Sequence, residues 1–134
     1  MTDARGAMDR LRIAVADGRL DQACRDAGIE LAVLFGSAVS EPDPGDVDLA
    51  IAFADPAQRD LLAVVVALQA LVGEPVDVLD LDRAGPVVRQ RALTRGELLV
   101  EHRPGAFAVR QMAAVREFIE TAPFRAMDLE LMAR

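Results

Sequence analysis

Apolar residues along the first hundred positions gather in short runs that end at glycine, proline or acidic residues. Two runs of five, 31–35 and 49–53, have the length and continuous apolar character of strands buried on both faces. A shorter run at 76–79 contains one acidic residue, Asp77. We therefore expect four strands, at 30–35, 47–53, 76–79 and 98–101.

Helical spacing of apolar residues marks most of the remaining chain. Residues 9–26 fit a helix that is broken near Gly18. Asp55-Pro56 has the sequence of a helix start, and the apolar stretch that follows to Val72 predicts a largely buried helix. Further helices are expected at 86–95, at 106–121 and from Pro123 onward. The chain is thus α/β, with helical ends.

The last two predicted helices carry apolar stripes. The first stripe consists of Met112, Val115 and Ile119, and stripes of this kind are more often core than interface. The final helix, however, has little remaining domain to cover. We therefore expect its stripe to face a partner protein. This stripe comprises Phe124, Met127, Leu131 and Met132.

The candidate functional residues lie between the first two predicted strands. Gly36-Ser37 closes the first strand, and Asp46-Val47-Asp48 opens the second. Glycine lets the backbone approach a phosphate closely, and the serine offers hydroxyl and N–H donors. Because side chains alternate along a strand, Asp46 and Asp48 share one face. Phosphate donors beside paired carboxylates predict a site for a Mg²⁺-bound nucleoside triphosphate.

A third carboxylate is expected from the third strand. Asp-x-Asp alone is weak evidence, because the chain has 14 aspartates and contains a second such pair, Asp80 and Asp82. That pair lies past the third strand, where a solvated turn is the simpler interpretation. Asp77 lies inside the strand, where a charge is costly unless it is paired or bound to metal. Asp80 would project from the opposite strand face, so we choose Asp77.

Gathered carboxylates favour a hard divalent cation. Two of them repel each other by about 4 kcal/mol at about 4 Å and an effective dielectric of about 20. The cluster therefore makes sense as a site for cations, and its oxygen ligands favour Mg²⁺ or Mn²⁺ over zinc. His102 has no second histidine and no cysteine near it in the sequence. We expect it to be a surface histidine and expect no zinc site.

In these residues the chain resembles the polymerase-β-like nucleotidyltransferases, whose pattern is Gly-Ser, a spacer, Asp-x-Asp and a later third carboxylate. The likeness covers about 30–101 well and the helices at about 106–134 more loosely, within a single expected domain of 1–134. It implies a small mixed sheet flanked by helices, with a helical C-terminal tail. It also implies Asp46, Asp48 and Asp77 as catalytic ligands of two Mg²⁺ ions, and Gly36 and Ser37 as nucleotide-binding residues for ATP.

Length and layout are most similar to the minimal nucleotidyltransferases, which act as antitoxins beside HEPN-type ribonuclease toxins. The resemblance implies transfer of AMP from ATP to a tyrosine of the cognate toxin, within a hetero-oligomer. Two alternatives stay open. One is an antitoxin that neutralises its toxin by binding alone, and the other is a nucleotidyltransferase for a small molecule such as an aminoglycoside.

One departure from the family concerns the spacer 38–45. The family commonly carries an arginine and a glycine soon after Gly-Ser, in a slightly longer spacer, whereas this spacer has no basic residue. Arg89, Arg91 and Arg95 lie on the helix predicted after the third strand. Arg91 and Arg95 share a face at i, i+4 and could meet phosphate or an acidic partner. A solvated helix face is the simpler interpretation.

Composition indicates which kind of partner and which cellular compartment to expect. The net charge is −7 and all 15 basic residues are arginines, which is a poor match for nucleic acid and suits a basic protein partner. The single cysteine, Cys24, cannot form an intrachain disulfide, and we expect it to be a partly buried thiol. We expect no secretion leader, and the apolar stretch at 61–72 is too short to span a bilayer. A cytoplasmic protein is therefore expected.

Overall fold

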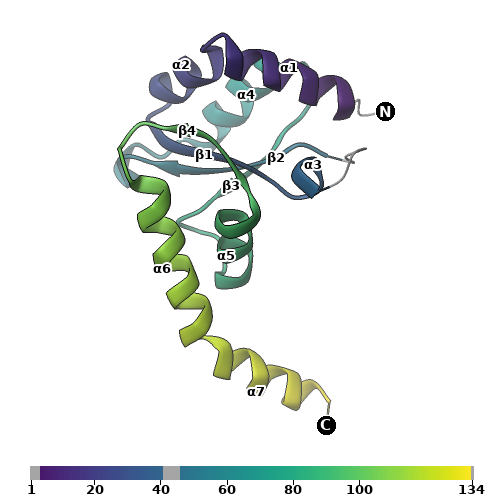
Figure 1. Ribbon diagram of the computed structural model, residues 1–134, viewed down its shortest axis with the longest axis vertical. Coiled ribbons are helices and arrows are strands. Elements are labelled where there is room, and N and C mark those ends of the chain that lie inside the picture. Colours follow the sequence, from purple (N-terminus) through teal and green to yellow (C-terminus); the bar gives the residue numbers. More distant parts are fainter. Residues whose placement is uncertain (1–3, 41–45, 134) are drawn as a thin grey trace.

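The computed structural model describes residues 4–40 and 46–133 of the chain. Its centre is a four-stranded sheet with the order β3–β2–β1–β4 (Figure 1). The strands are β1 (Ile29–Phe35), β2 (Asp48–Phe53), β3 (Asp77–Asp80) and β4 (Glu97–Glu101). β1 pairs antiparallel with β2 and with β4, whereas β2 and β3 are parallel. The expected mixed sheet is confirmed, and each strand lies within one residue of its predicted bounds.

Helices cover both faces of this sheet. Those on one face are α1 (Ala4–Ala16), α2 (Arg19–Asp26) and α4 (Leu61–Val72), and those on the other are α5 (Pro86–Arg95) and α6 (Ala106–Glu120) (Figure 1). Alternate side chains of β1 enter the two cores. Leu34 packs in the core that contains Leu11 and Leu20, and Val33 packs in the core that contains Leu93. Burial on both faces explains why β1 and β2 are apolar without alternation.

The predicted break at Gly18 is confirmed. α1 ends at Ala16 and α2 begins at Arg19. Between them Gly18 has φ 84°, a left-handed conformation that residues with a Cβ rarely adopt. The turn lets the two helices lie across the same face of the sheet, where both contribute fully buried leucines.

The helix predicted from Asp55 begins later and is less buried than expected. Pro56–Gln58 forms a short 3₁₀ turn, η1, whose cap Asp55 accepts a hydrogen bond from the N–H of Ala57. A second cap, Asp60, then starts α4 by accepting from the N–H of Ala63 over 3.1 Å. One face of α4 is buried, through Val64, Leu68 and Val72, while Leu62 and Val66 are exposed. The prediction of a largely buried helix was wrong because α4 covers the sheet with one face only.

A short helical turn follows β1. α3 (Ser37–Ser40) begins directly after Gly36 and was not predicted from the sequence. Most of the spacer 38–45 lies outside the described residues, which resume at Asp46.

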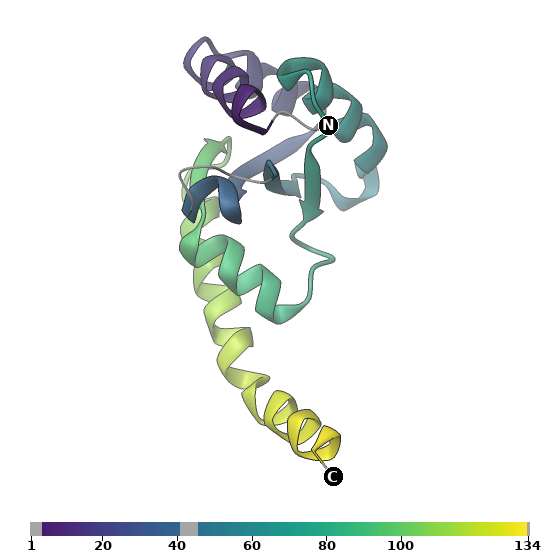
Figure 2. The ribbon, with the colours of Figure 1, turned by 90° about the vertical axis from the view of Figure 1, so that its right-hand side faces the viewer.

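The C-terminal helices leave the body of the fold. α6 packs on α5 and the sheet through Ala106 and Ala114, while Met112 and Ile119 are exposed, so its predicted apolar stripe is not core. α7 (Ala122–Met132) extends further away from the sheet (Figures 1 and 2) and has no buried residue. The stripe of α7 therefore faces outward, as expected of a surface that the domain does not cover. No helix in the described ranges is long and apolar enough to cross a membrane.

Candidate active site

The three predicted carboxylates meet where β2 and β3 begin. In the parallel register Asp48 is the partner of Asp77, so both side chains project from the same face of neighbouring strands. The backbone N–H of Asp77 donates to the carbonyl of Val47 over 3.0 Å and fixes this register. Asp77 and the charge of Asp46 both act on the carboxyl group of Asp48. The structure thus brings together the three acids that the sequence singled out.

Asp48 is the electrostatic centre of this cluster. Its pKa is raised to about 6, first by burial, then by the hydrogen bond with Asp77, and then by the negative charges of Asp77 and Asp46. A hydrogen bond between two carboxyl groups requires a proton on one of them. A nearby cation would favour the ionised form and reverse the shift.

The donor set fits a divalent cation of the Mg²⁺ type. All three groups offer carboxylate oxygens at or near the first residues of β2 and β3, and Asp46 and Asp77 are open to solvent. In residues 4–40 and 46–133 no three acidic, histidine or cysteine side chains are already spaced to hold an ion. Asp46, Asp48 and Asp77 are the residues that would hold it.

Gly36 forms the opposite wall of the site. The antiparallel register places Phe35 opposite Asp48, so the chain turns away from β1 directly beside this carboxylate. Gly36 has φ 76°, and a Cβ built on it would lie 2.6 Å from Oδ2 of Asp48. Glycine is therefore required twice, for the left-handed turn and for the close approach of the carboxylate. Ser37, half-buried, follows as the first residue of α3.

Asp80 has a different role from the one predicted. It is not part of a solvated turn, because it is 5% exposed and its Oδ2 lies 2.5 Å from Nε of Arg59. Its other oxygen accepts a hydrogen bond from the N–H of Asp82 over 3.0 Å. Both oxygens are thus engaged within the fold. Asp80 stabilises the end of β3 and does not join the acidic cluster.

Sequence reasoning missed a chain of ion pairs that includes Asp80. Glu30, 7% exposed on β1, accepts from Arg110 over 3.2 Å. Arg110 also binds Asp82 over 2.7 Å, and Arg59 lies between Asp82 and Asp80. Directly bonded members lie 21 to 80 residues apart, so no local sequence pattern indicates them. They tie β1 and β3 to α6.

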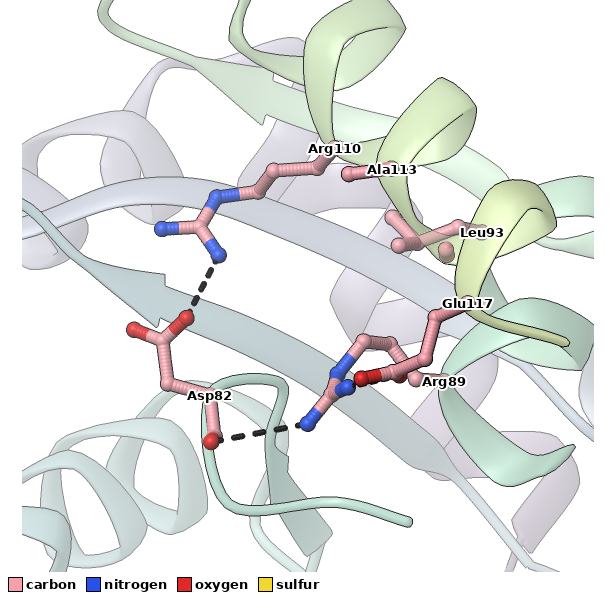
Figure 3. Close-up of a pocket in the computed structure, with 7 residues that line it drawn as sticks. Asp82, Arg89, Leu93, Arg110, Ala113 and Glu117 are labelled. Atoms are coloured by element: carbon pink, nitrogen blue, oxygen red, sulfur yellow. Dashed lines mark hydrogen bonds and ion pairs between the residues drawn. The ribbon is translucent and has the colours of Figure 1, made fainter. Parts of the chain in front are cut away.

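A cavity of about 310 Å³ lies between α5 and α6, and no residue of the acidic cluster lines it (Figure 3). Arg110 points to the carboxylate of Asp82, and Arg89 donates to the backbone carbonyl of Asp82. Arg89 also donates to the carbonyl of Leu81 over 2.7 Å and pairs with Glu117. The charged groups around this cavity therefore neutralise one another. They hold α6 against α5, and Arg89 is not available to an external anion.

His102 is also structural. It was expected on the surface, but its side chain is 15% exposed and both ring nitrogens are engaged. Nδ1 lies 2.8 Å from the carbonyl of Ile29 and Nε2 lies 2.9 Å from Oδ1 of Asp21. The hydrogen bond with His102 is the main reason why the pKa of Asp21 is lowered. Cys24 is buried, and burial raises its pKa to about 12, so it is an unreactive core thiol.

Comparison with known families identifies the fold. A family model described as Polymerase beta, Nucleotidyltransferase matches residues 20–104, which contain the Gly36-Ser37 turn and the three carboxylates. The chain belongs to this family. The match covers the whole sheet of this nucleotidyltransferase and ends before α6. No curated protein is a significant match to the chain.

Several solved structures share the fold of this nucleotidyltransferase. A chain of a toxin–antitoxin complex with AMP-PNP has a TM-score of 0.69 at 22% identity, with 87% of this chain and 98% of that chain covered. A chain from the complex of tri-AMPylated Shewanella oneidensis HEPN toxin with MNT antitoxin has a TM-score of 0.67 at 23% identity, with 87% and 95% covered. A structure assigned as a minimal nucleotidyltransferase has a TM-score of 0.52 at 26% identity, with 66% and 92% covered.

Proposed function

We propose that this protein is a Mg²⁺-dependent nucleotidyltransferase that moves AMP from ATP to a hydroxyl group of a partner protein. The observation that carries the proposal is the register of β2 and β3, which sets Asp48 beside Asp77, with Asp46 close enough for its charge to act on Asp48. Gly36 borders the same carboxylates. Membership of the nucleotidyltransferase family supports this assignment of the acidic cluster.

The reaction joins the acceptor oxygen to the α-phosphorus of ATP and breaks the bond from that phosphorus to the pyrophosphate. When bound, Mg²⁺ would neutralise phosphate charge and favour the ionised acceptor. Asp46, Asp48 and Asp77 would hold the cations, and Asp77 would help to take up the proton of the acceptor hydroxyl. Gly36 and Ser37 bind the β- and γ-phosphates, which leave as pyrophosphate. Positioning and charge neutralisation supply the rate enhancement.

The proposed acceptor is a tyrosine of a HEPN-type ribonuclease toxin, so that the protein acts as an antitoxin. Two of the structurally similar chains come from toxin–antitoxin complexes, and in one the HEPN toxin is AMPylated. The present chain contains no tyrosine, so the acceptor must come from another molecule. Its net charge of −7 favours encounter with a basic partner. The apolar stripe of α7 offers a surface for a stable interface with that partner.

Incubation of the protein with ATP, Mg²⁺ and the product of the neighbouring gene tests this function. Each transferred AMP should raise the intact mass of the partner by about 329 Da. The adduct should be absent with Asp46→Ala or Asp48→Ala, provided that circular dichroism shows both variants to be folded. Relief of toxicity without any mass change would favour neutralisation by binding alone. The absence of a basic residue in the spacer 38–45 is the observation that favours this second candidate.

A further inference from the structure

A second cavity adjoins the candidate active site at Gly36. Its volume is about 360 Å³. Phe35, Gly36 and Val39 line it from the end of β1 and from α3, and α5 lines it from the other side, where the two helices lie close together (Figure 2). Gly36 therefore borders both the candidate active site and this cavity. It lies against the carboxylate of Asp48 and also lines the cavity.

The α5 side of the cavity consists of Val88, Arg91 and Arg95. Their spacing of three and four residues places them on one face of the helix. Both arginines are exposed, and neither forms an ion pair with a carboxylate in the described part of the chain. Arg89, on the same helix, is neutralised inside the fold. The cavity is therefore bordered by two positive charges that no residue of the described chain neutralises.

Among the exposed arginines, Arg91 and Arg95 are distinguished by lining a cavity that Gly36 shares with the carboxylate of Asp48. The ligand that fits must carry several negative charges and must extend from the carboxylate cluster, past Gly36, to α5. The phosphate chain of a nucleoside triphosphate has this form. Guanidinium groups bind phosphate oxygens through paired N–H donors, with charge-assisted hydrogen bonds.

We propose that Arg91 and Arg95 bind the β- and γ-phosphates of the nucleoside triphosphate. They supply from α5 the positive charge that the spacer 38–45 lacks. This assignment rests on the proposed nucleotidyltransferase function. The assignment predicts a strong preference for triphosphate over monophosphate ligands. The arginines would contact only the β- and γ-phosphates, which a monophosphate lacks.

Isothermal titration calorimetry on the full chain can test this assignment with three probes: Mg²⁺-ATP, Mg²⁺-tripolyphosphate and AMP. The test variant is Arg91→Gln with Arg95→Gln. The control is Arg83→Gln with Arg116→Gln, which removes the same charge from two exposed arginines that do not line the cavity. The test variant should bind ATP and tripolyphosphate at least roughly tenfold more weakly, with AMP affinity changed by less than about twofold. Its melting temperature should match that of the wild type, because neither side chain forms a hydrogen bond or ion pair with the described residues.

Three results would overturn the assignment, and they are distinguishable. Equal ATP affinity of the test variant and the wild type would show that the two arginines do not bind the phosphates. The proposed function would not be affected by that result. Equal weakening in the control variant would mean that net charge alone is responsible. Failure of the wild-type protein to bind either Mg²⁺-ATP or tripolyphosphate would contradict the nucleotide site itself, and both proposals with it.

Discussion

Gly36 and Asp48 approach each other so closely that a Cβ at position 36 would lie 2.6 Å from Oδ2 of the aspartate. A glycine at the end of one strand therefore controls where the carboxylate of the next strand can lie. The left-handed φ of 76° adds a second reason for glycine at this position.

Gly36→Ala should therefore damage both the fold and the site. We expect a loss of about 1–3 kcal/mol in the free energy of unfolding, from the strained φ and the contact with Asp48. Urea denaturation would measure it. Gly28→Ala is the matched control, because Gly28 has a similar φ of 72° and no atom lies within 4 Å of an added Cβ. Equal stability of the two variants would contradict the close fit of Gly36 and Asp48.

Asp48→Asn should make the fold more stable at neutral pH when divalent cations are absent. The pKa of Asp48 is about 6 in the folded protein and about 3.8 for an unperturbed aspartate, so the folded state holds this proton more tightly. Ionisation therefore opposes folding above about pH 6, and the penalty fades as the pH falls from about 6 to about 4. The gain from asparagine should follow the same course. It should be largest near neutral pH and disappear near pH 4.

Thermal melts of wild type and Asp48→Asn in a chelator, over that pH range, would measure this difference. Asp128→Asn, on the exposed surface of α7, is the control for removal of one charge. A gain that stays constant over the whole range would show that burial and the neighbouring acids do not raise the pKa of Asp48.

Mg²⁺-ATP should stabilise the wild type but not Asp48→Asn. A ligand that binds the native state raises the melting temperature by mass action, and an ion would also relieve repulsion within the acidic cluster. We expect millimolar Mg²⁺-ATP to raise the melting temperature of the wild type and to leave that of Asp48→Asn unchanged. Differential scanning fluorimetry is sufficient for this test. An unchanged wild-type melting curve would count against a nucleotide site.

Removal of α7 tests its role as a partner surface. None of its residues is buried, so truncation after Thr121 should change the melting temperature of the free chain little. The same truncation should weaken complex formation with the partner, because it removes the exposed side chains of Phe124, Met127 and Leu131. Size-exclusion chromatography after co-expression would show the loss. A truncated chain that still co-elutes with the partner but melts several degrees earlier would assign α7 to the fold.

Much of the fold was readable from the sequence because burial on both faces turns β1 and β2 into continuous apolar runs. Helix details were less readable. Asp55 and Asp60 both have the sequence of a cap, and only the structure shows that the first caps η1 and the second starts α4. An apolar helix such as α4 also gives no local sign of which side will meet the sheet.

The candidate site was predictable to the extent that its residues lie near strand termini. Asp46, Asp48 and Asp77 were singled out because a glycine turn, a strand start and a charge inside an apolar run are local patterns. The structural role of Asp80 was not predictable, because its partner Arg59 lies 21 residues earlier in the chain. Pairing of Glu30 with Arg110 spans 80 residues and carries no sequence signal at all.

Intact-mass measurement of the partner after incubation with ATP, Mg²⁺ and either Asp77→Asn or Asp80→Asn tests the central claim most directly. Asp77 lies in register with Asp48, whereas both oxygens of Asp80 are engaged by the fold. We predict that Asp77→Asn abolishes the AMP adduct and keeps the wild-type circular dichroism spectrum. Asp80→Asn should melt earlier and yet retain the adduct wherever it is folded. Transfer by Asp77→Asn at the wild-type rate would contradict the assignment of the acidic cluster as the catalytic centre.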